Sequence, residues 1–450
     1  MRDLFTALPE DPAPPLADGY MQTVLVRGRR SVRRRRLGAA AAWSAVVLIL
    51  IALFPVVRPE PRPAAPAPQP SVPDRFAAYS TLTATVERAA PGRAIALYTY
   101  GNGELFNMHQ PLVVGADRDT YRRVGAIEER DRPVSLLSPD GTQVLVGERR
   151  GWTTDLLLVD LTTGDRRRVP VHGNGQVRLL AWSPDQRYVA YSEADADSVY
   201  ASVDDAETNA VMLGLLRIMD LTTGTDIVIT SVKQPYTAAF APDSARIAVQ
   251  TPQAVHLLNM EGFEDGTVTI PAGQGLVARV AWSPDGRFLA TVPWDGNARD
   301  DTIYLRDKGP VTFVPLAPTT TAPAPIDHVA RPLGWRDADH LIAATTDDHD
   351  RPSLTEITVS TGDRRPLSSF DTTQSCEFGT QHCEVSDLQL ATALLPNLTV
   401  RPAQSPDNGP WPQPLRILAV ALPLAFAALV LLMLQRRRRA LRRSRSSSLM

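Results

Sequence analysis

The two cysteines are the residues whose chemistry depends most on the compartment. Cys376 and Cys383 are the only cysteines among 450 residues, and His382 lies between them. A structural zinc site needs four ligands, so this set is incomplete, and the spacing differs from the Cys-x-x-Cys of redox-active dithiols. Outside the cytoplasm such a pair can be oxidised. We expect a structural disulfide, with a metal pair and a redox dithiol as the alternatives.

Two acidic segments could meet a Ca²⁺ ion. One is Asp347–Asp350, and the other contains Glu193, Asp195 and Asp197. Neither has the spaced oxygen ligands and the turn glycine of an EF-hand loop. We interpret both as solvated acidic loops. The histidines are scattered along the chain, at positions 109, 172, 256, 328, 340, 349 and 382.

The sequence lacks the short motifs of common enzyme classes. It has no Gly-x-Ser-x-Gly nucleophile elbow, no His-Glu-x-x-His and no phosphate-binding P-loop. We therefore assign no catalytic, cofactor-binding or metal-binding residue, and the pattern favours a protein that is not an enzyme.

A repeated segment organises the middle of the chain. Its fullest copy is Trp282-Ser-Pro-Asp-Gly-Arg-Phe288, an apolar strand, a turn and a second strand. Proline presets φ, aspartate can bond its own backbone, and glycine accepts a positive φ, so the motif predicts a β-hairpin. Related copies lie at 136–146, 180–190 and 239–249, with a degenerate one at 333–343.

A second hairpin follows each of the first kind. Its turn is Asp160-Leu-Thr-Thr-Gly164 in one unit, Asp220-Leu-Thr-Thr-Gly224 in the next and Ser360-Thr-Gly362 in the last. Two hairpins make a four-stranded sheet. The turn prolines 139, 184, 242 and 284 are 45, 58 and 42 residues apart, which fits one propeller blade per unit.

This pairing of turns resembles the WD-repeat-like blades of TolB-type β-propellers, over about residues 92–370. The resemblance implies an all-β fold that serves as a binding platform, an assembly scaffold or a gating domain of peptidases. It gives the Ser-Pro-Asp-Gly residues the role of turn formers. No peptidase domain has room after residue 370.

We predict six blades. The first is expected at 94–124, with strands at 94–100, 104–109, 112–115 and 121–124. Five more are expected at 133–171, 177–232, 236–273, 277–316 and 330–370. Radial repetition removes long exposed sheet edges when the ring closes. Thr81–Glu87 and Val385–Ala391 are candidate closing strands, or alternatively parts of a seventh, split blade.

The charges are segregated along the chain. Residues 1–58 carry nine arginines and four acidic residues, residues 416–450 carry eight arginines and no acidic residue, and the middle is acidic. The uncharged apolar runs 37–57 and 417–434 have the length of membrane spans. Arginines precede the first run and follow the second, so the positive-inside rule predicts both termini in the cytoplasm. The membrane is thus an expected partner, with the plasma membrane as the location.

The expected organisation follows from these features. It comprises a cytoplasmic basic head (1–36), a transmembrane helix (37–57), a Pro-rich extracytoplasmic spacer (58–75), the propeller (76–400), a tether (401–416), a second transmembrane helix (417–434) and a cytoplasmic tail rich in Arg and Ser (435–450). The head resembles the amino-terminal region of some actinobacterial membrane-anchored propeller proteins.

One connection inside the repeats is unusually long. Residues 193–212 hold six acidic residues and Tyr200, and loops of this length in compact domains tend to be functional or disordered. We predict a partner contact through Tyr200, Asp204 and Asp205, with a disordered excursion as the alternative. An acidic ectodomain repels phosphates, so nucleic acid is not an expected partner.

The leading hypothesis is a non-enzymatic binding or scaffold protein of the cell surface. It would present the propeller to an envelope protein or a cell-wall ligand. A transmembrane sensor that signals through its cytosolic head is one alternative. A propeller enzyme that uses carboxylates converging in its central channel is the other.

Overall fold

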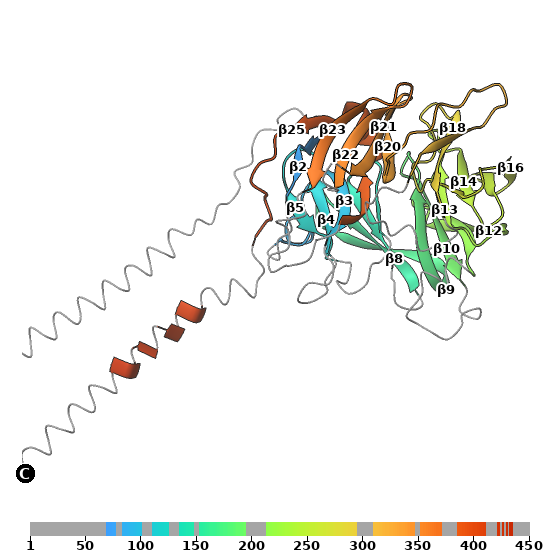
Figure 1. Ribbon diagram of the computed structural model, residues 1–450. Coiled ribbons are helices and arrows are strands. Elements are labelled where there is room, and N and C mark those ends of the chain that lie inside the picture. Colours follow the sequence, from blue (N-terminus) through green and yellow to red (C-terminus); the bar gives the residue numbers. More distant parts are fainter. Residues whose placement is uncertain are drawn as a thin grey trace, which may run out of the picture. The chain divides into compact units, whose positions relative to one another are not determined.

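The computed structural model describes most of the chain after residue 68 (Figure 1). The described residues are 69–77, 83–100, 110–125, 135–147, 153–194, 213–294, 309–346, 352–370, 385–410 and short helical pieces within 421–434. The chain divides into two compact units, Met1–Ala67 and Pro68–Met450, and all described residues belong to the second.

The strands form six blades, each with its inner strand beside the channel. The first blade contains β24 (Val385–Leu390), β3 (Ala94–Tyr100), β4 (Gln110–Gly115) and β5 (Tyr121–Arg123). The second contains β6 (Ser135–Leu137), β7 (Gln143–Val146), β8 (Thr153–Asp160) and the start of β9 (Arg166–Trp182). The end of β9 begins the third, followed by β10 (Tyr188–Ala194), β11 (Leu215–Asp220) and β12 (Thr225–Lys233).

The remaining three blades follow the repeats in chain order. The fourth contains β13 (Thr237–Phe240), β14 (Arg246–Gln250), β15 (Val255–Asn259) and β16 (Glu264–Val268). The fifth contains β17 (Gln274–Leu276), β18 (Phe288–Pro293) and β19 (Thr312–Pro315). The sixth contains β20 (Arg331–Asp337), β21 (His340–Thr346), β22 (Pro352–Thr358) and β23 (Arg364–Phe370). The prediction of six blades is confirmed.

The ring closes through a strand from the far end of the chain. β24 pairs antiparallel with β3, with Val385 opposite Tyr100 and Leu390 opposite Ala96. Thr85 bridges Arg123 at the outer edge of the same blade. Both candidate closing segments therefore join the first blade, and the alternative of a seventh blade is wrong.

The first blade also differs from its sequence prediction in composition. Four consecutive strands were expected between residues 94 and 124, but the described strands there number three, and β24 is the fourth. The expected strand 104–109 lies outside the described residues. A strand supplied by a distant segment leaves no local signal, because its pairing depends on the whole ring.

Segments from both ends of the propeller lie beside each other. β1 (Ser71–Pro73) pairs parallel with β25 (Thr399–Arg401), and β2 (Arg75–Phe76) extends the sixth blade beside β23 (Figure 1). The Arg401 guanidinium donates to Ser71 Oγ at 2.8 Å and forms an ion pair with Asp119 at 2.8 Å. Residues 71–76 and 399–401, expected at the margins of the spacer and tether, are thus strands of the fold.

Tightly packed side chains fill the spaces between blades. The largest apolar cluster joins the first, second and sixth blades and includes the stacked rings of Phe76 and Phe370, with centroids 4.3 Å apart. Tyr98 meets both rings edge-on at 5.8 Å. Such aromatic pairs add stability beyond their buried area, so the closing region has a rigid core.

The repeated turns are held by their own side chains. In the fifth blade Ser283 Oγ donates to Asp285 Oδ1 and accepts the Phe288 N–H, and Asp285 Oδ1 also accepts the Arg287 N–H. The same bonds recur around Ser138 and Ser183. The residue two after each turn proline has a positive φ, between 58° and 74°, at Gly141, Gln186, Ser244 and Gly286. The Ser-Pro-Asp-Gly motif therefore forms and stabilises a turn, as predicted.

Two tryptophans of the repeat link neighbouring blades. The Trp282 indole N–H donates to the Ala239 carbonyl of the fourth blade at 2.9 Å, and that of Trp335 donates to the Val280 carbonyl of the fifth at 3.2 Å. Buried indole N–H groups need an acceptor. The repeat thus sets both the turn and the spacing of successive blades.

Among the described residues, no helix has both the length and the apolar character that crossing a membrane requires. The first predicted span, 37–57, lies outside the described residues, and the second, 417–434, is described only in pieces.

We predict that two glycines with the same backbone conformation tolerate alanine differently. Gly141 and Gly286 have φ of 74° and 71°, so Gly→Ala at either costs about 1 kcal/mol of backbone strain. A Cβ on Gly141 would lie 1.9 Å from the Ala94 carbonyl oxygen, whereas one on Gly286 meets nothing within 4 Å. Denaturant unfolding should show a loss of about 1 kcal/mol for G286A and a clearly larger loss for G141A. Equal losses would contradict the close approach of Gly141 in the second blade to Ala94 in the first.

A second prediction concerns acid. Burial alone would raise the pKa of Asp285, but hydrogen bonds from Ser283 and Arg287 outweigh it and hold the pKa below its usual value. A depressed carboxyl pKa gives stability that is complete above the unfolded value of about 3.9 and is lost as the pH falls through the folded value. The destabilisation by D285N should therefore be constant from pH 7 to about pH 5 and shrink below about pH 4. Denaturant unfolding of the unaltered protein and of D285N at several pH values measures the difference in stability. A difference that does not change with pH would contradict the prediction.

Candidate functional site

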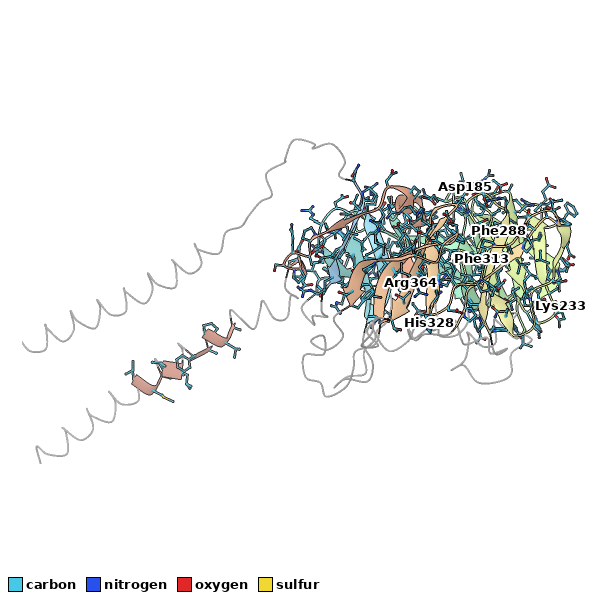
Figure 2. All side chains as sticks on the ribbon, turned by 45° about the horizontal axis from the view of Figure 1, so that its top comes forward. Asp185, Lys233, Phe288, Phe313, His328 and Arg364 are labelled. Carbon is cyan, nitrogen blue, oxygen red and sulfur yellow. The ribbon has the colours of Figure 1, made fainter. Side chains whose placement is uncertain are left out.

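The propeller has two unlike faces. Short hydrogen-bonded turns form one face, here called the turn face, and comprise 138–141, 160–164, 183–186, 220–224, 241–244, 259–262, 283–286 and 358–362. The opposite strand ends carry the two longest connections between blade strands, 195–214 and 294–311, together with 101–109, 124–134, 147–152, 347–351 and 371–384. We call this side the long-connection face. The connection 316–330 begins on the turn face and is the exception to its short turns. Asp185 on a turn and Lys233 at the end of β12 lie on opposite sides in Figure 2.

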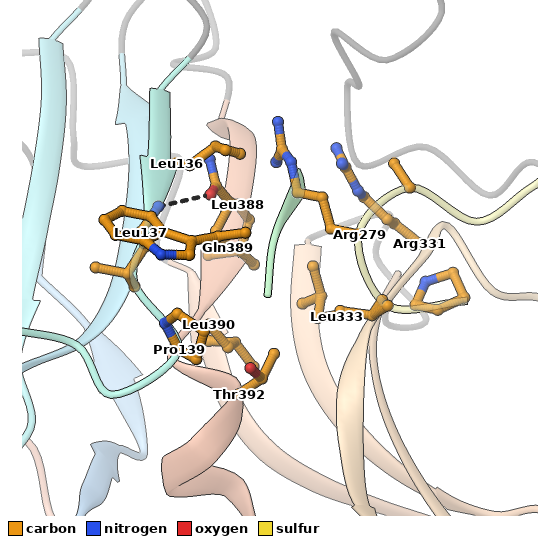
Figure 3. Close-up of a pocket in the computed structure, with 14 residues that line it drawn as sticks. Leu136, Leu137, Pro139, Arg279, Arg331, Leu333, Leu388, Gln389, Leu390 and Thr392 are labelled. Atoms are coloured by element: carbon orange, nitrogen blue, oxygen red, sulfur yellow. Dashed lines mark hydrogen bonds between the residues drawn. The ribbon is translucent and has the colours of Figure 1, made fainter. Parts of the chain in front are cut away.

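A small cavity of about 50 Å³ lies in the central channel (Figure 3). Residues of the inner strands of the first, second, third and sixth blades line it, together with 278–280 of the fifth. Its walls are mostly apolar, and they include the Trp182 ring. A cavity of this size has room for a few water molecules or a chemical group of similar size.

Two arginines, Arg279 and Arg331, line the cavity. Arg331 is the first residue of β20 and only 6% exposed, and Arg279 lies on the bulge after β17. Figure 3 shows both side chains extending toward the same end of the channel, away from Pro139 and Thr392. Pro139 belongs to the turn face, so the guanidiniums point toward the long-connection face. The lining residues include no aspartate or glutamate.

The backbone at Arg279 is unusual. Its φ is +67°, a left-handed conformation that is strained for a residue with a side chain. The Arg279 N–H donates to the Ala238 carbonyl at 2.8 Å, which fixes the bulge against the inner strand of the fourth blade. Backbone strain of this kind clusters at binding and catalytic sites. The bulge sends the Arg279 side chain into the channel, where a regular strand would direct it toward a neighbouring blade.

Gln389 joins two blades beside the arginines. Its amide oxygen accepts the Leu137 N–H at 3.0 Å, and its amide nitrogen donates to the Ser135 carbonyl at 2.8 Å (Figure 3). Both polar ends of this side chain thus serve β6, the inner strand of the second blade. Gln389 therefore fixes the closing strand against its neighbour and shapes the wall of the cavity.

The third blade contains a buried charged cluster that sequence reasoning missed. The Tyr191 hydroxyl donates to Asp226 at 2.5 Å, Arg217 forms ion pairs with both Asp226 and Glu193, and His172 Nδ1 lies 2.5 Å from Asp226. Burial, and then the bond to Asp226, raises the pKa of Tyr191. These residues come from four different strands, so no spacing in the sequence could reveal them.

The cluster explains one of the acidic segments. Glu193 was expected to lie in a solvated loop, but it is buried and paired with Arg217. It is therefore a structural residue, and the expectation is wrong at this position. Asp195, Asp197 and Asp347–Asp350 lie outside the described residues. Within the part of the chain that the structure describes, no group of three or more His, Cys, Asp and Glu could hold a metal ion.

The other sequence-predicted site residues also lie outside the described residues. Tyr200, Asp204 and Asp205 belong to the connection between β10 and β11, and Cys376 and Cys383 to the connection between β23 and β24. Both connections join strand ends on the long-connection face. The partner contact and the disulfide remain predictions. The channel arginines are described but were not foreseen, because single arginines in two separate repeats form no motif.

We predict that the buried cluster matters for stability and that a surface pair does not. Arg217 is 18% exposed and faces carboxylates that are 4% and 1% exposed, whereas Arg168 is 77% exposed beside Asp155. Removing one partner of a buried pair costs about 3 to 5 kcal/mol, and an exposed pair contributes about 0 to 1 kcal/mol. R217A should therefore unfold at much lower denaturant than R168A. Similar unfolding midpoints for R217A and R168A would show that the cluster is solvated and would contradict the prediction.

No family model matches the chain, and no curated protein matches it. Among solved structures it is similar to TolB from Acinetobacter baumannii, with 16% identity and a TM-score of 0.40 over 66% of this chain and 67% of that one. It is also similar to an oligogalacturonate lyase from Vibrio parahaemolyticus (13%, TM-score 0.42, 69% and 81%) and to hydrazine synthase from Kuenenia stuttgartiensis (13%, TM-score 0.37, 66% and 80%). These likenesses are too weak to carry an argument about function, and the six-bladed propeller rests on the strand pairing described above.

Proposed function

We propose that this protein is a non-enzymatic binding or scaffold module of the cell surface, and that its long-connection face receives an envelope protein or a cell-wall ligand. The observation that carries the proposal is the asymmetry of the two faces. Binding residues are found disproportionately on loops that a rigid scaffold positions. Here the two longest connections between blade strands, 195–214 and 294–311, issue from one face, while the other carries mostly short turns, with 316–330 as the exception.

The composition of the channel favours binding over catalysis. A propeller enzyme with converging carboxylates needs acidic side chains along its channel, and the cavity is lined by arginines, a glutamine and apolar residues. The buried carboxylates of Glu193 and Asp226 are engaged with Arg217 within the third blade. The binding hypothesis therefore accounts for more of the described side chains than the enzyme hypothesis does.

Membrane attachment at both ends is part of the proposal. Its support is the charge pattern of the two apolar runs and the exposed apolar side chains of the second, which include Leu422, Phe426 and Leu432. The pairing of β1 with β25 adds a geometric argument, because the two ends of the propeller lie side by side. This adjacency suits two anchors on the same membrane.

The test is partner capture with matched variants. Photo-crosslinkers at Thr346 and Pro352, the strand ends that flank one long connection, should capture an envelope component in cells. The same crosslinkers at Thr222 and Thr361 on the turn face should capture it much less. Deletion of 194–210 should weaken capture if Tyr200, Asp204 and Asp205 contribute. Equal capture from both faces, or capture only from the turn face, would contradict the proposal.

A further inference from the structure

Segments of the chain itself cover the outer edges of two blades. An outermost strand presents unpaired N–H and C=O groups, and native proteins cover such an edge or place charges and prolines on it. In the first blade the Val86 N–H donates to the Arg123 carbonyl of β5, and in the sixth β2 pairs with β23 as a fifth strand. A blade of this propeller therefore accepts a strand added to its outer edge.

Charge, glycine or proline protects three further outer edges. The residues concerned are Arg166–Arg168 and Pro170 in the second blade, Glu264, Asp265 and Gly266 in the fourth, and Pro315 in the fifth. Such residues disfavour an added strand, because charges repel or stay hydrated and proline lacks the N–H that pairing needs.

β12 of the third blade has an open outer edge. It lies at the rim of the propeller as the last strand of its sheet, and no other described strand pairs with its outer side (Figure 1). Between Asp226 and Lys233 lie six uncharged residues, Ile227–Val232, of which five are β-branched and none is proline or glycine. Because β-branched residues favour strand pairing, the composition of β12 favours an added strand.

The register of β12 shows which of its backbone groups face outward. The turn before β12 makes Thr225 a bonded partner of β11, as the identical turn of the second blade does for its own strands. Since bonded pairs alternate along antiparallel strands, Ile227 and Ile229 also bond to β11, and the N–H and C=O groups of Val228 point away from it. The register shifts beyond Ile229, so Thr225–Ile229 is the regular part of the open edge.

Exposed apolar side chains surround this edge. Ile227 is 39% exposed, Val228 42% and Phe263 67%. Phe263 follows Gly262, which lies against β12, since a Cβ on Gly262 would be 3.2 Å from Ile229 and 3.7 Å from Ile227. A strand added to β12 would cover these side chains, and exposed apolar groups gathered at one place mark interaction sites.

The charges beside the edge select the kind of partner. Glu261 and Asp265 are exposed on either side of Phe263. Arg217 of β11 is already paired with two carboxylates, and Lys233 lies beyond the register shift. A second copy of the chain would bring a second set of the same acids to the interface, whereas basic groups of a partner are attracted to it.

We propose that the open edge of β12 takes an added strand from a partner protein, an extended segment of uncharged β-branched residues flanked by basic residues. Its main chain bonds the outward groups of Val228, its apolar side chains cover Ile227 and Phe263, and its basic ends meet Glu261 and Asp265. In strand addition, main-chain bonds supply affinity and side chains supply specificity. This surface goes beyond the proposed contact of the long-connection face and does not require it.

Binding of fluorescent heptapeptides to the full-length protein, measured by anisotropy at low ionic strength, tests the proposal. Lys-Val-Thr-Val-Thr-Val-Lys should bind, and Glu-Val-Thr-Val-Thr-Val-Glu should bind at least about tenfold more weakly. The Lys-flanked peptide with proline in place of its central valine should also bind at least about tenfold more weakly, because it lacks one N–H. No binding of the first peptide, or equal binding of all three, would overturn the proposal.

A matched pair of variants locates the site. Val228 and Val400 of β25 are both 42% exposed. V228K should weaken binding of the Lys-flanked peptide about tenfold or more, and V400K should leave it unchanged. The double variant E261Q and D265N should reduce the preference for the Lys-flanked over the Glu-flanked peptide. Unchanged binding in V228K, equal loss in V400K, or a dimer of the unaltered protein that V228K dissociates would overturn the proposal.

This proposal and that of the long-connection face have separate readouts. Thr222 lies on the turn beside β12, so in the capture experiment Thr361 is the turn-face control remote from this site. Loss of peptide binding in V228K with intact capture at Thr346 supports both proposals. Failure of the peptides with intact capture overturns only the added strand, and peptide binding without capture overturns only the long-connection face.

Discussion

The pairing of β24 with β3 is the interaction on which the rest of the structure depends. It joins residues 385–390 to residues 96–100, across nearly the whole propeller. Without it, β3 would be an open strand edge of the first blade, and the channel would lose the wall that β24 supplies. Gln389, the Phe76–Phe370 stack and the clamp of Arg401 on Ser71 and Asp119 all lie close to this junction in the chain or in space. Closing a loop of this length costs conformational entropy and slows folding. The contacts at the junction offset the entropy cost.

The same junction connects fold to function. β24 supplies Leu388, Gln389 and Leu390 to the cavity, and β20 of the neighbouring blade supplies Arg331. The connection that contains Cys376 and Cys383 leads directly into β24. A disulfide there would restrain the closing strand from the long-connection face. The strand that closes the ring therefore also forms part of the wall of the channel cavity.

The sequence predicts the repeated hairpins of the propeller but not the contacts that occur only once. Ser-Pro-Asp-Gly fixes a turn through bonds between residues at most five apart, so the hairpins around Ser283 and Asp160 could be placed from the sequence alone. Blade number followed from repeat spacing. The donation of β24 to the first blade could be listed only as one of two possibilities, since strand pairing over such a distance has no local signature. The Tyr191–Asp226–Arg217 cluster and the channel arginines Arg279 and Arg331 were not found, because their members come from separate strands or blades that only the folded propeller brings together.

Native-state hydrogen exchange of the full-length protein tests ring closure most directly. If β24 closes the ring, the amide of Ala391 directly after it, which donates to the Ile95 carbonyl of β3, should exchange as slowly as the paired amides of β3, and both segments should lose protection together as denaturant is added. The strands of the fourth blade, opposite the junction, provide the internal reference. Rapid exchange of Ala391 while β3 stays protected would show that the ring is open at this point, and it would contradict the account of both the channel and its cavity.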